Sequence, residues 1–266
     1  MPSLKLPGGA ELAFTDSGTG PPLILVHGSP GEGRSWARVA PLLAGHYRVV
    51  VPDLPGSGRS DPLPDAATGR TAAMGAAIGV LIQSLGRDVH LCGHSYGANV
   101  ALHAAVSNRS KVGRLTLLEP VFFRALHLVG DKEVLEPAVR FFSAYADRVT
   151  GGEPEAVCDM IDYWFGGGAF AKLPATVQGF LKTAAAKNGV DVRAAFSETM
   201  TLEQLAAFTN PATVAYGATS PATAPAIAGA LVGLLPHAQL QVISGAHHGM
   251  LDTHAQAVAD LIRQST

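Results

Sequence analysis

A serine between small residues is the first group in the chain that suggests catalysis. Residues 93–97 read Gly-His-Ser-Tyr-Gly, directly after an apolar run at 89–92 and directly before a helix-length segment at 98–107. On a sharp turn from strand to helix, this pattern is typical of an exposed nucleophile, because the glycines permit a strained bend. Ser95 is therefore predicted to attack a carbonyl carbon, and an ordinary strand-to-helix turn is the alternative interpretation.

A second loop supplies groups that suit the same reaction. Residues 27–30 read His-Gly-Ser-Pro and follow an apolar run at 23–26. In folds of this type, such a loop gives one backbone N–H to an oxyanion hole, and the residue after the nucleophile gives the other. The predicted donors are the N–H groups of Ser29 and Tyr96. His27 is interpreted as a brace of this loop that borders the substrate site, rather than as the catalytic base.

Taken together, several segments resemble the α/β-hydrolase superfamily over nearly the whole chain. They are the two loops above, the loop Asp-Leu-Pro-Gly-Ser-Gly-Arg-Ser at 53–60 and Gly-Ala-His-His at 245–248, with an insertion where this superfamily carries its cap. The resemblance implies the chain order nucleophile, acid, histidine. Registering Gly245 on the superfamily's Gly-X-Gly-His segment makes His248 the predicted base, with the adjacent His247 as the alternative.

The acid departs from the commonest pattern of that superfamily, in which an Asp follows the glycine after the seventh strand by two or three residues. Here residues 216–221 read Tyr-Gly-Ala-Thr-Ser-Pro, and no Asp or Glu occurs from Gln204 to Leu251. Glu119 ends the apolar run at 115–118, which in this fold neighbours the nucleophile strand. We expect Glu119 to orient His248, and a salt-bridge residue that faces the cap is the alternative role.

Alternating apolar runs and helix-length segments indicate the scaffold that must hold these groups. Strands are expected at 23–26, 47–51, 89–92, 115–118, 213–216 and 240–243, with an antiparallel edge strand at 10–15. Helices are expected at 36–44, 71–85, 98–107, 221–235 and 253–263. This alternation predicts the α/β class and, with the resemblance, the α/β-hydrolase fold: a mostly parallel, doubly wound sheet with a helical cap inserted after the sixth strand.

A stretch of helical periodicity divides the chain into two predicted parts. Residues 121–210 contain no convincing strand, so they are expected to form the cap, while 1–120 and 211–266 form the hydrolase core. Within the cap, helices are expected at 131–149 and 153–165. The following residues are predicted to contact substrate, and an alternative is that the aromatic ones only build the core of the cap: Phe122, Phe123, Trp164, Phe165 and Met250.

Composition restricts the partners of the protein. The chain has 266 residues, with 19 Lys and Arg against 21 Asp and Glu, and shows no run of like charges. This charge balance disfavours binding to nucleic acid or to an anionic membrane surface. No signal peptide or membrane-spanning run is visible, so a cytoplasmic protein is expected. No cluster has the spacing of metal ligands, and neither a metal nor an organic cofactor is expected. The sequence does not indicate whether the protein forms a homo-oligomer.

The predicted function is that of a carboxylesterase-like serine hydrolase. It would cleave an ester, thioester or amide of a small, apolar substrate through an acyl-enzyme on Ser95. Serine in the nucleophile position disfavours the epoxide hydrolase and haloalkane dehalogenase branches, which attack with Asp. Two alternatives remain: C–C bond hydrolysis or cofactor-free haloperoxidase and perhydrolase chemistry on the same triad, or ligand binding without catalysis.

Overall fold

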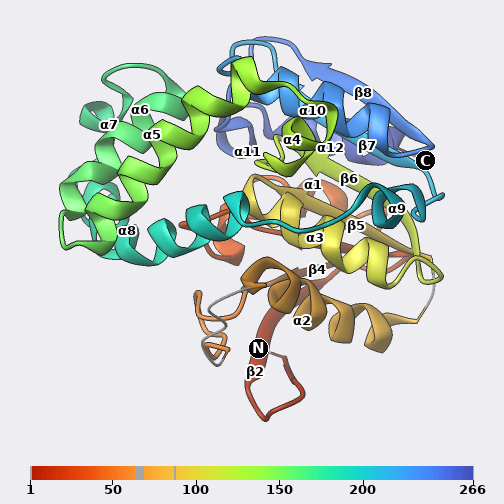
Figure 1. The fold of residues 1–266 in the computed structure, drawn as a ribbon. Coiled ribbons are helices and arrows are strands. Elements are labelled where there is room, and N and C mark those ends of the chain that lie inside the picture. Colours follow the sequence, from red (N-terminus) through yellow and green to blue (C-terminus); the bar gives the residue numbers. More distant parts are fainter. Residues whose placement is uncertain (1, 64–68, 87, 266) are drawn as a thin grey trace.

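One eight-stranded sheet forms the centre of the structure, a computed structural model that describes residues 2–63, 69–86 and 88–265 (Figure 1). The strand order is β1-β2-β4-β3-β5-β6-β7-β8. β1 pairs with β2, and β2 with β4, in antiparallel directions, while the remaining pairs are parallel. The predicted α/β-hydrolase fold is thereby confirmed. The strands are β1 (Ser3–Lys5), β2 (Glu11–Ser17), β3 (Pro22–Val26), β4 (Arg48–Pro52), β5 (Val89–His94), β6 (Val112–Leu118), β7 (Ala212–Gly217) and β8 (Ala238–Ile243).

Residues in the central strands alternate between two apolar layers, which explains the continuous apolar runs. Leu23 and Leu25 of β3 pack on the side of α1 (Ala40–Leu43) and α12 (Ala255–Gln264). Ile24 and Val26 pack on the opposite side. That side is covered by α2 (Arg70–Leu85), α3 (Tyr96–Ser107) and α10 (Thr223–Leu234). Helices on both faces exclude water from the sheet, as parallel strands require.

One end of the sheet differs from the sequence prediction. The strand expected at the edge, 10–15, lies inside as β2, because the short β1 adds beyond it. β8 forms the other edge, where Leu240 and Val242 are 42% and 49% exposed. An edge strand has a neighbour on one side only, so its apolar residues are less covered than those of central strands.

Two predicted helices have different bounds in the structure. The segment 36–44 begins on Trp36, the last residue of η1 (Gly33–Trp36), a turn of 3-10 helix, and it ends in the separate α1. Pro41 lies in the first turn of α1 and has no N–H to continue a preceding helix, so a new helix begins there. The segment 253–263 begins on Thr253, the last residue of α11 (Met250–Thr253), and α12 accounts for most of it.

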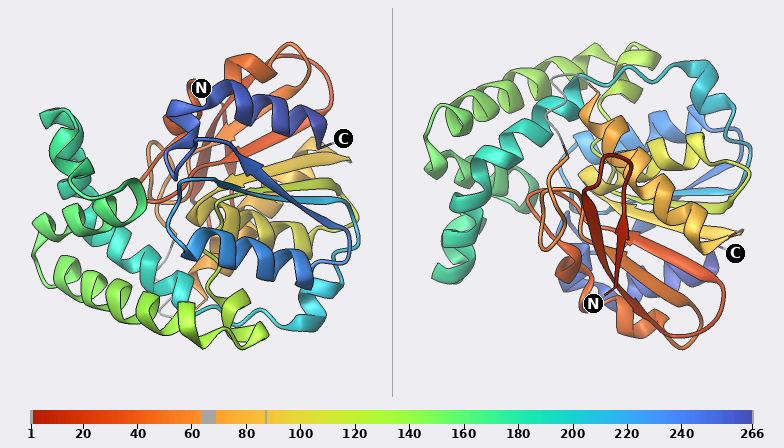
Figure 2. Two further views of the ribbon diagram at one scale, coloured as in Figure 1. Left: turned by 90° about the horizontal axis from the view of Figure 1, so that it is seen from above. Right: turned by 90° about the horizontal axis from the view of Figure 1, so that it is seen from below.

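The connection from β6 to β7 is helical, as its periodicity predicts. It contains α4 (Arg124–Val129), α5 (Lys132–Thr150), η2 (Pro154–Ala156), α6 (Val157–Phe165), α7 (Ala169–Lys172), α8 (Ala175–Phe196) and α9 (Leu202–Ala206). α5 to α8 extend to one side of the sheet, in green and teal (Figures 1 and 2). The division into a core and a cap at 121–210 stays a prediction. Among the described residues, no helix combines the length and the apolar character needed to span a membrane.

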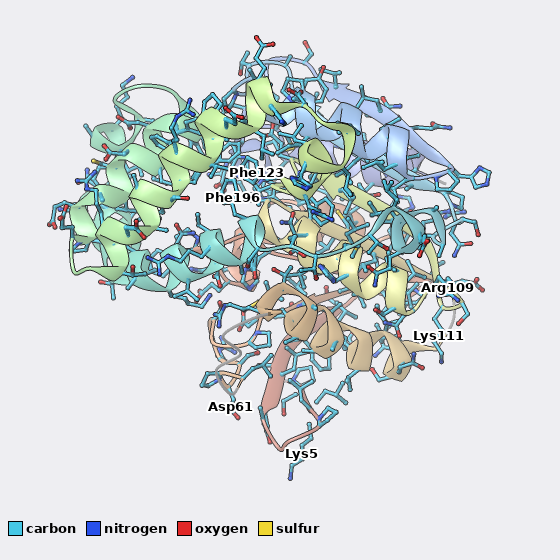
Figure 3. All side chains as sticks on the ribbon, viewed as in Figure 1. Lys5, Asp61, Arg109, Lys111, Phe123 and Phe196 are labelled. Atoms are coloured by element: carbon cyan, nitrogen blue, oxygen red, sulfur yellow. The ribbon has the colours of Figure 1, made fainter. Side chains whose placement is uncertain are left out.

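Aromatic side chains pack against one another within this helical connection. Phe123, just after β6, stacks on Phe196 at the end of α8, with ring centroids 4.2 Å apart (Figure 3). Phe142 of α5 packs against both Phe123 and Trp164 of α6. These four aromatic residues therefore form one continuous cluster between β6 and β7.

Candidate active site

Ser95 occupies a strained turn between β5 and α3. Its φ and ψ angles are 55° and −127°, a region that side-chain-bearing residues rarely adopt. The two flanking glycines are required by space: a Cβ on Gly93 would lie 2.4 Å from the Gly97 carbonyl oxygen, and one on Gly97 would lie 2.2 Å from the His27 carbonyl oxygen. Such close packing holds the turn and places the serine hydroxyl beyond the end of the sheet.

Glu119 follows the next strand, β6, and the residue is 1% exposed. Its Oε1 accepts hydrogen bonds from the Gly217 N–H, at 2.6 Å, and from the Ser220 hydroxyl. Its Oε2 lies 2.8 Å from Nδ1 of His248. Burial alone would raise the pKa of this carboxyl, but the hydrogen bonds from His248, Ser220 and Gly217 lower it below its usual range. Glu119 is thus held as a carboxylate.

His248 lies between Glu119 and Ser95. Its Nδ1 faces the carboxylate, and its Nε2 lies 2.9 Å from the Ser95 hydroxyl oxygen. Because Nδ1 donates to the carboxylate, Nε2 is free to accept the serine proton. The indole of Trp164 stacks on the imidazole, with ring centroids 4.4 Å apart. The structure thus brings the three residues proposed from the sequence into one line of hydrogen bonds.

The two adjacent late histidines have different surroundings. His247 is half-buried, and its Nδ1 accepts a hydrogen bond from the Gly249 N–H instead of contacting Ser95. His94, next to Ser95 in the chain, contacts the backbone of His248. Its Nε2 donates to the His248 carbonyl oxygen at 2.9 Å, and burial and the nearby His248 lower its pKa to about 3. A neutral His94 therefore anchors the backbone of His248.

The loop after β3 approaches Ser95 closely. Ser29 and Tyr96, the predicted oxyanion donors, both line the cavity at Ser95. Within residues 2–63, 69–86 and 88–265, neither backbone N–H has a hydrogen-bond acceptor. His27 braces the loop: its Nδ1 donates to the Gly28 carbonyl oxygen, and its Nε2 accepts from the Leu54 N–H.

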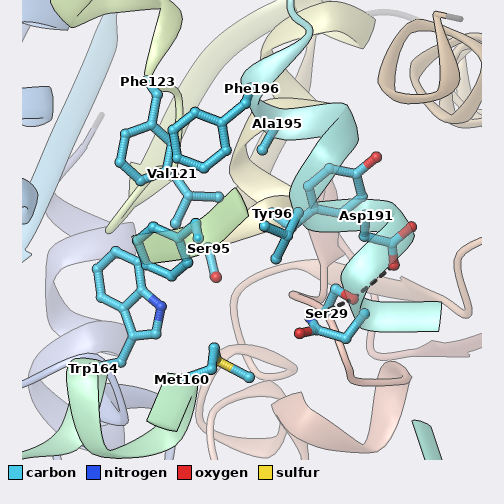
Figure 4. Close-up of a pocket in the computed structure, with 13 residues that line it drawn as sticks. Ser29, Ser95, Tyr96, Val121, Phe123, Met160, Trp164, Asp191, Ala195 and Phe196 are labelled. Carbon is cyan, nitrogen blue, oxygen red and sulfur yellow. Dashed lines mark hydrogen bonds between the residues drawn. The ribbon is translucent and has the colours of Figure 1, made fainter. Parts of the chain in front are cut away.

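Two cavities meet at Ser95. The small pocket has a volume of about 30 Å³, and the large pocket about 210 Å³. The small pocket has an aromatic side and a polar side, with Ser95 between them (Figure 4). The aromatic side contains Phe123, Phe142, Trp164 and Phe196, and the polar side contains Ser29, Asn188 and Asp191. The large pocket is lined by His248, His94 and Phe165 among others, and it shares Ser29, Ser95, Met160 and Trp164 with the small one.

Three of the predicted substrate contacts do not border either pocket in the structure. Phe122 and Met250 are fully buried in the two apolar layers. Both ring nitrogens of His27 form hydrogen bonds with the backbone, and none of these three residues lines either pocket. Phe123, Trp164 and Phe165 do line a pocket. Two of the aromatic residues, Phe123 and Trp164, have both of the roles considered for them. They pack against other aromatic rings, and they also border the small pocket.

Asn188 and Asp191 of α8 were not singled out from the sequence. Both are buried, at 2% and 1% exposed, and both border the small pocket. An Asn and an Asp three positions apart in a helix are ordinary surface residues in most proteins, so their spacing carried no signal. Only the tertiary packing of α8 against the loop after β3 makes them part of the site.

The chain is similar in sequence to known hydrolases over part of its length. A soluble epoxide hydrolase of Corynebacterium sp. (strain C12) is 36% identical over 114 residues, which cover 42% of this chain and 39% of that protein. A 2-hydroxy-6-oxononadienedioate/2-hydroxy-6-oxononatrienedioate hydrolase of Dechloromonas aromatica (strain RCB) is 36% identical over 115 residues, 41% of this chain and 39% of that protein. The matched part is thus about two fifths of each of these curated relatives.

A solved structure is similar over the full length. A thermophilic esterase from Thermogutta terrifontis superposes with a TM-score of 0.75 at 28% identity, covering 100% of this chain and 99% of that one. The sequence model of the alpha/beta hydrolase family matches residues 23–261, which include the loop after β3, the turn at Ser95, Glu119 and His248. On the match to that model and on its fold, the chain belongs to the alpha/beta hydrolase family.

Proposed function

We propose that the protein is a serine hydrolase that cleaves an ester, thioester or amide of a small, uncharged substrate. The observation that carries this proposal is the line of hydrogen bonds from Ser95 through His248 to Glu119, with lengths of 2.9 and 2.8 Å. A nucleophile, a base and an orienting acid within hydrogen-bond reach are the geometric requirement for acyl transfer.

The proposed reaction proceeds in two halves. Ser95 Oγ attacks the carbonyl carbon while His248 Nε2 takes the serine proton, and Glu119 stabilises the imidazolium. The oxyanion receives hydrogen bonds from the N–H groups of Ser29 and Tyr96. His248 then returns its proton to the leaving group, which departs and leaves an acyl group on Ser95. Water, deprotonated by His248, attacks this acyl group and releases the acid and free Ser95.

The two pockets suggest where each half of the substrate lies. His248 lines the large pocket and not the small one, and the leaving group must lie next to His248 to receive its proton. The leaving group is therefore assigned to the large pocket. The acyl group then enters the small pocket, whose aromatic walls and volume of about 30 Å³ suit an acetyl or propionyl chain.

A preference for short acyl chains is the expected result. Wild-type protein should hydrolyse acetyl and propionyl esters of one alcohol faster than the hexanoyl ester, because each methylene that does not fit costs about 10-fold or more in kcat/KM. Phe196→Ala removes one aromatic wall of the small pocket and should move the preference towards longer acyl chains. A series of p-nitrophenyl esters measures this, and an unchanged chain-length profile in the variant would contradict the assignment.

The nucleophile and base are tested by a covalent probe. A fluorophosphonate should label Ser95, as detected by mass spectrometry of the modified peptide, and His248→Ala should abolish both labelling and ester hydrolysis. His247→Ala is the matched control, because His247 adjoins His248 without reaching Ser95, and should retain both. Failure of the wild-type protein to react with the probe would favour a binding protein without catalysis.

A second candidate is hydrolysis of a C–C bond next to a ketone on the same triad. The similarity to the oxononadienedioate hydrolase supports it. That relative's named substrate is a dicarboxylate, whereas the described lining of the two pockets contains neither Lys nor Arg. An acidic substrate would lack a charge partner there, and so we favour a neutral ester. Assaying an oxo-dicarboxylate beside a neutral acetyl ester distinguishes the two reactions.

A further inference from the structure

The hydroxyl of Ser29 is held by helix α8. Ser29 Oγ donates to Oδ2 of Asp191 at 2.6 Å (Figure 4) and accepts from Nδ2 of Asn188 at 3.1 Å. Asn188 is fixed in turn by the Tyr145 hydroxyl, which donates to its Oδ1 at 2.6 Å. Both the donor and an acceptor site of the Ser29 hydroxyl are therefore engaged by residues more than 150 positions away in the chain.

Asp191 is itself fixed from three directions. Arg70, at the start of α2, donates to Oδ1 at 2.7 Å, and Lys187, one turn earlier in α8, donates to Oδ2 at 3.0 Å. Together with Ser29, these groups give the buried carboxylate three donors, two of them cationic. A buried carboxylate needs such partners to remain charged. Asp191 borders the small pocket, but its oxygens are committed to these protein donors rather than to a ligand.

We propose that Asp191 and Asn188 are positioning residues that set the backbone of Ser29 through its hydroxyl, and so set the oxyanion-binding N–H. This inference rests on the proposed hydrolase function. The helical connection between β6 and β7 then does more than line a pocket: its helix α8 completes the catalytic geometry of a loop that precedes it by about 160 residues. The identity of residue 29 therefore matters through its side chain, not only through its backbone position.

The hydrogen bonds that Asp191 and Asn188 make with the Ser29 hydroxyl are here called the clamp. The clamp should have a large effect on the catalytic rate, because an oxyanion donor acts only in the correct place. A donor must lie within about 3 Å of the developing oxyanion, and a displacement of about 1 Å can cost about 10²-fold in rate. The Ser29 loop packs tightly against Ser95, since a Cβ on Gly28 would lie 2.9 Å from the Ser95 Cβ. Release of the hydroxyl lets the loop move relative to the nucleophile.

Ser29→Ala is the variant that tests the clamp. It keeps the backbone N–H and leaves Asp191 paired with Arg70 and Lys187, whereas replacing Asp191 itself would leave two cations unpaired and destabilise the fold. We expect kcat to fall by about 10²-fold with little change in KM. Affinity for a boronic acid, which forms a tetrahedral adduct on Ser95, should fall in parallel. Ser29→Thr keeps the hydroxyl and should restore most of the rate.

Arg193→Met is the matched control. It breaks an exposed ion pair between the same helix and Asp147 of α5, without touching the loop, and should leave kcat and boronate affinity unchanged. An unchanged kcat in Ser29→Ala, or a loss expressed in KM alone, would overturn the clamp while leaving the hydrolase proposal intact. A wild-type protein that neither hydrolyses esters nor reacts with a fluorophosphonate would overturn both.

Discussion

Glu119→Gln is expected to lower kcat by about 10⁴-fold, the cost measured when the acid of such a triad becomes its amide. The amide has nearly the shape of the carboxylate, so the buried site can retain its packing and the protein should remain folded. The loss arises from the hydrogen-bond pattern around residue 119 rather than from a disrupted structure.

The neighbours of Glu119 determine which way a glutamine amide would point. Oε1 accepts from two donors, the Gly217 N–H and the Ser220 hydroxyl, while Oε2 faces His248. The amide oxygen of glutamine should take the position of Oε1, because an NH₂ group there would oppose the Gly217 N–H. The NH₂ group then faces Nδ1 of His248 and requires it to accept. The proton moves to Nε2, which can no longer take the proton from Ser95.

A relocated carboxylate provides the control. Ser220 contacts Glu119 directly and lies three residues after Gly217, one of the positions at which the resemblance to the α/β-hydrolase superfamily places an Asp. Adding Ser220→Asp to Glu119→Gln should recover part of the lost rate, since it returns a carboxylate to the same space. Steady-state kinetics with an acetyl ester measures both variants, and circular dichroism checks the fold. A Glu119→Gln protein with wild-type kcat would eliminate Glu119 as the acid.

Local patterns explain why the sequence predicted the nucleophile turn and most strands. The turn at Ser95 depends on the two flanking glycines and the apolar run before them, all of which lie within a short segment. Glu119 could be proposed because parallel strands end at one edge of a sheet, and the unusual lack of acids from Gln204 to Leu251 left few alternatives.

Features that depend on contacts between distant segments could not be predicted. The hydrogen bond from Ser29 to Asp191 connects residues that lie 162 positions apart in the chain, and it depends on how α8 lies over the loop after β3. Apolar character likewise did not distinguish residues of the core from residues of the pocket. Phe122 and Phe123 are adjacent and identical in type, but one is fully buried and the other borders the small pocket. Their roles differ because neighbouring side chains leave the chain in different directions.

As the pH is lowered, the free energy of unfolding should begin to decrease at pH values well above those at which carboxyl groups titrate. His27 and His90 are buried, and burial lowers the pKa of each to about 4, while that of His94 falls to about 3. In the unfolded chain such groups have pKa values of about 6.5. As the pH falls from about 6.5 towards 4, the unfolded chain gains protons that the folded protein does not, so the free energy of unfolding decreases.

Each of these histidines should contribute a slope of up to about 1.4 kcal/mol per pH unit in that window. Urea unfolding at pH 7.5, 6.0 and 5.0 measures the slope. His90→Asn should make it shallower, since asparagine does not titrate and can still bond to Thr116, whose hydroxyl lies 2.9 Å from the His90 Nε2. His237→Asn replaces an exposed histidine as a control. Because His90 lies in the sheet away from Ser95, its contribution to the slope reports on folding alone. A free energy of unfolding that stays constant from pH 7.5 to 5.0 would contradict the prediction. It would show that the folded protein takes up these protons as readily as the unfolded chain.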